Sequence, residues 1–146
     1  MSIQTAVRGR FERSFGLYRD LVDSISPENL GSRLGDVPSN TIGGQLWCVV
    51  GARESYSRAI KAGKWSGFAC SLDDPASPSK VRAALTRSEA DVREALGVLD
   101  SATDVAQGLV LDLLEHEAAH QGQLIRYLYA LKLEIPPSWK ARYALT

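Results

Sequence analysis

The chain contains few of the residues that mark several large classes of protein. Its 146 residues include only two cysteines, two histidines and one methionine. Two cysteines are too few for a disulfide-stapled scaffold of this length, so we expect Cys48 and Cys70 to remain thiols. The formal net charge is 0, so the basic excess of nucleic-acid-binding domains is absent. We therefore expect neither nucleic acid nor a membrane surface as a partner.

Long hydrophobic runs are also missing. No stretch reaches the roughly 20 apolar residues that a membrane-spanning helix needs, and Met1–Thr5 does not begin the apolar region of a signal peptide. We therefore expect a cytoplasmic location. The composition, 45% hydrophobic and 23% charged, is that of an ordinary globular protein. A chain of this length suits one domain, which we expect to span residues 1–146.

Helical periodicity, in contrast, runs through most of the chain. Apolar residues recur three and four positions apart in four segments, and no segment alternates as a strand would. The predicted helices are about Ile3–Ile25, Thr41–Ala62, Ser79–Leu99 and Thr103–Lys132. Helices of this length favour an all-α four-helix bundle, with the tail residues Trp139 and Tyr143 packed back onto it. The connections after the first two helices are long, which predicts at least one long crossover.

The two histidines, His116 and His120, stand four residues apart in the last predicted helix. Because this spacing is just over one helical turn, both imidazoles project from the same face. That face is otherwise apolar, so the ring nitrogens need partners, and a divalent metal would satisfy both rings. The alternative is a hydrogen-bonded pair of core histidines without a metal.

A zinc-like site needs a third protein ligand, and the chain has no third histidine. Cys48, in the second predicted helix, is the best candidate, because a thiolate binds zinc well. Small residues share its flank of that helix: Ala52, Ser55 and Ala59. They would leave room for a metal, a water or a substrate, or would simply allow close helix packing. A site of three ligands would keep one coordination position open.

The segment from His116 to His120 reads His-Glu-Ala-Ala-His, which also matches the motif of zinc metalloproteases. In those enzymes the glutamate is the general base and a further ligand follows downstream. Here only Glu134 follows, next to prolines, and no sheet is predicted to hold a peptide substrate. The sequence therefore argues against a metalloprotease.

Charged residues near the candidate ligands have ordinary expected roles. Glu115 and Glu117 lie on other faces of the predicted helix than the histidines, and we expect both to be solvated. Arg53 and Glu54 are expected to form ordinary surface ion pairs, with each other or with Arg126.

Two stretches of the chain carry a family resemblance. The segment His116–Leu124, followed by Tyr127–Leu128 and Ile135–Pro137, resembles the last helix of the DinB/YfiT-like superfamily. The segment Asn40–Glu54 resembles the second helix of that superfamily, where a histidine normally stands. The resemblance covers most of the chain in the order of its helices, and its specific part is these two motifs.

The resemblance implies a four-helix bundle, often a homodimer, in which three histidines hold a divalent metal. His116 and His120 match the histidine pair, and Cys48 stands at the position of the third histidine. A thiolate ligand makes the implied site softer, which favours zinc, or nickel, over manganese. Family members with known activities are metal-dependent transferases or isomerases that use a small thiol such as mycothiol, bacillithiol or glutathione.

The resemblance thus implies a thiol-dependent transferase whose partners are a small-molecule thiol and an electrophile. Two alternatives remain. The chain is a non-catalytic metal-binding or stress-associated bundle, or it is a metal-free interaction domain with a vestigial site.

Overall fold

The computed structural model describes all of residues 1–146 and is entirely helical, with no strand. The α-helices are α1 (Ile3–Ser24), α2 (Ile42–Ala62), α3 (Pro78–Leu96), α4 (Asp104–Ala130) and α5 (Pro137–Tyr143), and two short 3₁₀ segments are η1 (Pro27–Gly31) and η2 (Leu99–Ser101). The predicted all-α class is confirmed. None of these helices combines the length and the apolar character that crossing a membrane requires.

Hydroxyl side chains begin all four long helices. In each case the oxygen accepts the backbone N–H three residues further on, and the capping residues are Ser2, Thr41, Ser77 and Thr103. Such caps satisfy N–H groups that have no partner within the helix. The third helix ends at Leu96, before the predicted Leu99, because Gly97 is a poor helix former and the chain continues into η2.

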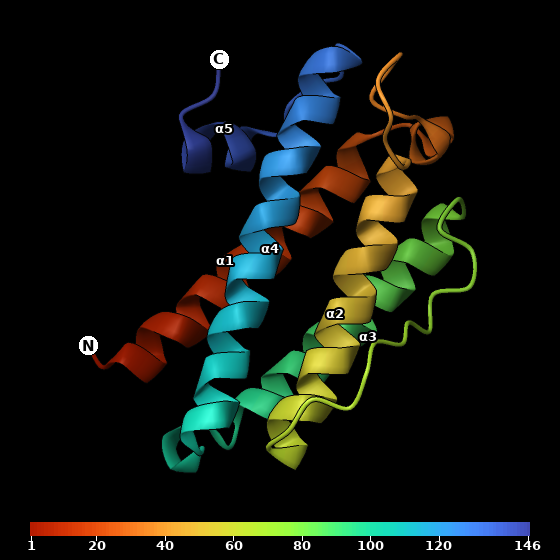
Figure 1. The fold of residues 1–146 in the computed structure, drawn as a ribbon. Coiled ribbons are helices and arrows are strands. Elements are labelled where there is room, and N and C mark those ends of the chain that lie inside the picture. Colours follow the sequence, from red (N-terminus) through yellow and green to blue (C-terminus); the bar gives the residue numbers. More distant parts are fainter.

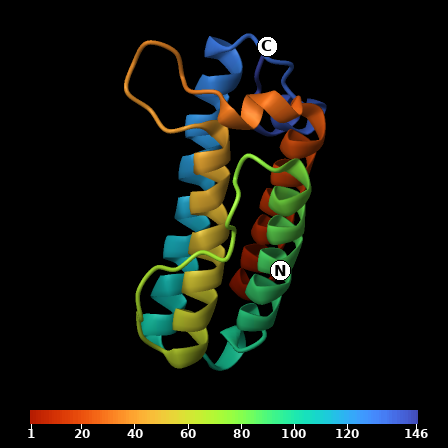
Figure 2. The same ribbon diagram turned by 90° about the vertical axis from the view of Figure 1, so that its right-hand side faces the viewer.

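The long helices pack as a bundle in which α2 and α1 each contact both α3 and α4. In Figure 1, α1 and α4 run upward while α2 and α3 run downward. Because α2 and α3 run in the same direction, residues 63–77 must return along the length of the bundle, and Figure 2 shows this segment lying across the front. This segment is the long crossover that the sequence predicts. The connection between α1 and α2 stays at one end.

Two glycines of α2 allow neighbouring backbone to approach closely. A Cβ atom on Gly43 would lie 2.3 Å from the carbonyl oxygen of Pro75, and one on Gly51 would lie 2.3 Å from the ring of Phe68. Both contacts are shorter than real Cβ atoms make, so a side chain at either position would displace the crossover. The glycines lower the helix propensity of α2, and their position against the crossover explains why they are there.

The short helix α5 closes one end of the bundle. The fully buried Trp139 meets the ring of Tyr18 edge-on at a centroid distance of 6.2 Å. Its indole N–H donates a 2.7 Å hydrogen bond to the carbonyl of Leu17. The prediction that the tail packs back on the bundle is confirmed, although its helical turns were not predicted.

Candidate metal centre

The three candidate ligands meet at the interface of α2 and α4. Helix α2 brings Cys48, which is half-buried, and α4 brings the half-buried His116 and the buried His120. One ligand atom of each residue lies within 4.8 Å of the others. Nε2 of His116 lies 3.2 Å from Nε2 of His120 and 3.7 Å from Sγ of Cys48. The structure therefore brings together the three residues that the sequence singled out.

These separations can be compared with the edges of a coordination tetrahedron. With Zn–N bonds of about 2.0–2.1 Å and a Zn–S bond of about 2.3 Å, two nitrogen ligands lie about 3.3–3.4 Å apart and a nitrogen and a sulfur about 3.5–3.6 Å apart. The observed separations, 3.2 Å between the nitrogens and 3.7 Å from nitrogen to sulfur, fall close to both values. Two edges of the group thus match a tetrahedral site, and the Cys48, His116 and His120 side chains could hold a divalent metal ion.

His120 is held in one tautomer by a chain of hydrogen bonds. The amide nitrogen of Gln45 donates to Asn40 at 2.9 Å, so the amide oxygen of Gln45 faces the imidazole. Nδ1 of His120 must then donate the proton, which leaves the lone pair on Nε2, the atom that faces the other ligands. Tyr127 donates to the same Asn40 oxygen at 2.7 Å. A metal-ligating histidine typically has such a partner on its other nitrogen.

Sequence reasoning missed Gln45. A signal for it existed, because Gln45 precedes Cys48 by three residues and so lies on the same flank of α2.

His116 is less firmly oriented than its neighbour. Its Nδ1 atom is buried and has no hydrogen-bond partner. Its hydrogen-bond-distance partners are Cys48 and His120, which both face Nε2. Its orientation therefore depends mainly on what occupies the space between the three ligands.

The surroundings favour the neutral form of both rings. Burial, together with the nearby His116, lowers the pKa of His120 to about 4, and burial also lowers the pKa of His116. At neutral pH both imidazoles thus keep the lone pair that a metal requires. Burial raises the pKa of the Cys48 thiol. Binding a metal through this sulfur must therefore release a proton.

The expectation that Arg53 and Glu117 are solvated surface charges is wrong. Arg53 is fully buried and Glu117 is 1% exposed, and the guanidinium binds both carboxylate oxygens, with Nη2 lying 3.1 Å from Oε2. Ser14 donates a 2.7 Å hydrogen bond to Oε2, and the ring of Phe15 lies 4.7 Å from the guanidinium carbon. This ion pair joins α2 to α4 in the interior of the bundle.

The ion pair follows from the position of Glu117 on α4. A step of one residue from His116 turns the side chain by about 100°, away from the ligands and toward the axis of the bundle. A carboxylate held by a buried guanidinium cannot serve as the general base of a metalloprotease. The structure agrees with the sequence argument against that class. Glu115 is exposed, as expected.

Glu54 and Arg126 do not join Arg53. Glu54 accepts hydrogen bonds of 3.0 Å from both the backbone N–H and the hydroxyl of Ser71 in the crossover. Arg126 is exposed and forms no ion pair. The expected pairing among these three residues is therefore not found.

The small residues beside Cys48 serve packing. The hydroxyl of Ser55 donates to the carbonyl of Ala69 at 3.0 Å and accepts the N–H of the same residue at 2.9 Å, which fastens the crossover to α2. Ala52 and Ala59 are buried. Of the two interpretations of this flank, close packing is the one that the contacts support.

No protein-family model matches the chain, and no curated protein matches it. The structure itself defines a helical bundle that carries a Cys/His/His group able to bind a metal ion. The resemblance to the DinB/YfiT-like superfamily stays a hypothesis that depends on the two sequence motifs.

Proposed function

We propose that this chain is a DinB-like four-helix bundle whose Cys48, His116 and His120 hold a divalent metal, zinc in preference to nickel. Its proposed activity is the metal-dependent transfer of a small-molecule thiol to an electrophile. One observation carries the proposal: the three ligand atoms lie within 4.8 Å of one another, with two separations close to tetrahedral edges. The thiolate among the ligands favours zinc over harder ions.

The residues around the centre have distinct roles in this proposal. Zinc bound by three protein ligands would lower the pKa of a thiol or water at its open position. Gln45 keeps the lone pair of His120 directed at the centre. Cys48 and His116 are only half-buried, so a small molecule can approach from their side.

Metal analysis of protein purified without an affinity tag tests the centre. We expect close to one zinc per chain, with the metal lost in His120→Ala and in Cys48→Ser. Cys70→Ser is the matched control and should keep its metal, because that thiol lies outside the ligand group. Gln45→Leu should weaken zinc binding by about 10- to 100-fold, since the partner of a ligating histidine tunes its affinity.

Two results would contradict the proposal at this stage. One is protein without metal whose melting temperature does not respond to zinc or to a chelator. The other is a Cys48→Ser variant with unchanged zinc affinity, which would remove the cysteine from the ligand set and leave only the histidine pair.

The catalytic part needs its own measurement. Zinc-loaded protein should accelerate the reaction of a small thiol with an electrophile such as 1-chloro-2,4-dinitrobenzene, and His120→Ala should abolish the acceleration. Glutathione, mycothiol and bacillithiol are the thiols to compare. Zinc binding without turnover of any of them would reject the transferase proposal while leaving the metal centre intact.

A non-catalytic metal-binding bundle is the second candidate, and one observation favours it. Five hollows in the surface border α1, and none of the three candidate ligands lines any of these five. A metal that only joins α2 to α4 would need no such space. It would raise the melting temperature and give no turnover.

A further inference from the structure

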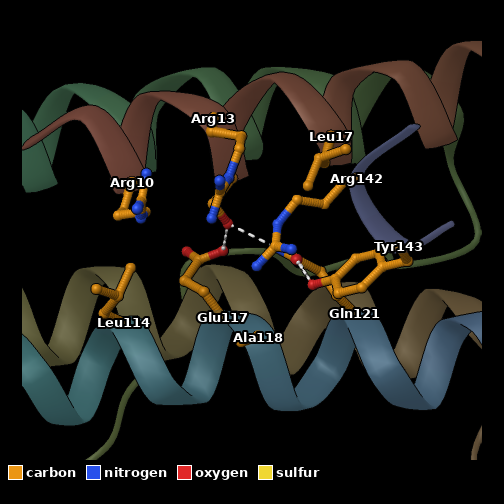
Figure 3. A pocket seen from close by; sticks show the side chains of 10 residues that line it. Arg10, Arg13, Leu17, Leu114, Glu117, Ala118, Gln121, Arg142 and Tyr143 are labelled. Carbon is orange, nitrogen blue, oxygen red and sulfur yellow. Dashed lines mark hydrogen bonds between the residues drawn. The ribbon is translucent and has the colours of Figure 1, made fainter. Parts of the chain in front are cut away.

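A cavity of about 230 Å³ lies between α1, α4 and α5, away from the candidate metal centre. Figure 3 shows that the side chains of Arg10 and Arg13 descend into it from α1, and that Arg142 of α5 enters between α1 and α4. The other lining polar residues are Ser14, Glu117, Gln121 and Tyr143. Arg10, Arg13 and Arg142 are all exposed, so three guanidinium groups from two separate helices border one small, open space.

These guanidiniums have no carboxylate partner. None of the three forms an ion pair, and the only acid lining the cavity, Glu117, is already bound by the buried Arg53. Burial and the charges of Arg142 and Arg10 lower the pKa of Arg13, as expected where like charges face one another. Because the whole chain has a net charge of 0, this cavity is a local concentration of positive charge.

The floor of the cavity is an ordered network of hydrogen bonds. Gln121 donates to Ser14 at 2.7 Å, Ser14 donates to Glu117 at 2.7 Å, and Tyr143 donates to the amide oxygen of Gln121. Helix α5 carries Arg142 and is anchored by the buried Trp139. The arginines therefore surround a rigid polar floor.

We propose that this cavity binds a small molecule through an oxyanion, a phosphate or a carboxylate group, held by Arg13 and Arg142 with Arg10 at the rim. Planar guanidinium groups bind such oxyanions through paired hydrogen bonds. The site is separate from the metal centre, because α4 presents Glu117 and Gln121 to the cavity and its histidines to α2.

Calorimetric titration with inorganic phosphate and with succinate, each at constant ionic strength against a chloride reference, tests the proposal. We expect saturable binding of at least one of the two probes. A preference for phosphate identifies a phosphoryl ligand, and a preference for succinate identifies a carboxylate ligand. Arg13→Gln and Arg142→Gln should each weaken binding by about tenfold, since each variant loses a guanidinium that pairs with the oxyanion through charge-assisted hydrogen bonds.

Arg87→Gln is the matched control, because this substitution removes the same charge from α3. Arg87, like the cavity arginines, is exposed and forms no ion pair. Its affinity should equal that of the unaltered protein. Arg10→Gln, which removes the third guanidinium at the cavity, replaces either variant that fails to fold. The proposal is overturned if neither probe saturates, or if Arg87→Gln weakens binding as much as the cavity variants. Loss of binding in His120→Asn with full binding in the cavity variants would place the anion at the metal centre and would also overturn it.

Discussion

Neighbouring residues of α4 make contacts with different partners in the interior of the bundle. Consecutive positions face different surroundings: His116 faces the ligands from α2, while Glu117 faces the buried guanidinium of Arg53. Arg53 and Glu117 both continue a buried apolar stripe of their helix. The buried Val49 stands four residues before Arg53, and the buried Leu113 stands four residues before Glu117. This helical spacing indicated that both charged side chains are buried, as partners of an ion pair. The sequence analysis missed the ion pair because it took charge as a sign of solvent exposure.

Removing one partner of this ion pair should destabilise the fold strongly. Glu117→Gln leaves the guanidinium of Arg53 buried without a counter-charge, and the expected loss is about 3–5 kcal/mol in the free energy of unfolding, measured by urea denaturation. Glu115→Gln is the control, because Glu115 stands two residues earlier on α4 and is exposed. It should change the free energy of unfolding by less than about 0.5 kcal/mol.

The double variant Arg53→Met with Glu117→Leu should recover much of that loss. Apolar residues of similar size often replace a buried ion pair with little net cost. A Glu117→Gln variant as stable as the parent would show that the buried guanidinium does not need this carboxylate.

At the scale of elements, sequence patterns located the four long helices well because each begins with a hydroxyl cap and keeps an apolar stripe. The end of α3 was misplaced because the apolar pattern continues to Leu99 although the helix stops before Gly97. Helix α5 has only 7 residues, too few for periodicity to show. Its position depends on the docking of Trp139, which no local pattern describes.

The packing of the crossover on α2 can be tested with one glycine. Gly43→Ala should destabilise the protein by about 1–3 kcal/mol, the usual cost of overpacking. Its new methyl group would meet two backbone oxygens, those of Pro75 at 2.3 Å and Leu30 at 2.9 Å, and backbone cannot move aside cheaply.

Gly108→Ala is the matched control on α4, where a Cβ atom would have nothing within 4 Å. That variant should gain up to about 1 kcal/mol, because alanine favours a helix over glycine. Thermal or urea unfolding gives both values, and equal effects at the two positions would argue against the close approach of the crossover.

At the scale of the whole molecule, stability should depend on pH through the buried imidazoles. His120 has a pKa of about 4 in the folded protein against an ordinary value of 6.5. Between these values the unfolded chain binds a proton that the folded chain does not, so the free energy of unfolding should fall as the pH falls from about 6.5 toward 4. His116, whose pKa is also lowered, contributes in the same direction.

Melting curves recorded across this range in the presence of a chelator measure the effect. His120→Gln should flatten the dependence because it removes the titrating ring. An unchanged slope in that variant would assign the acid sensitivity to other groups. The homodimer implied by the family resemblance stays a prediction, which analytical ultracentrifugation would test.

The sequence by itself determined the helical class, the long crossover and the identity of the three candidate ligands, because periodicity, loop length and the scarcity of histidine and cysteine are local or compositional properties. Only the tertiary structure decided that Cys48 meets the histidine pair. The same holds for the buried partners Arg53 and Glu117, and for the convergence of Arg142 on the arginines of α1. These contacts join residues far apart in the chain, and the packing of whole helices, which no local pattern contains, sets the distances between them.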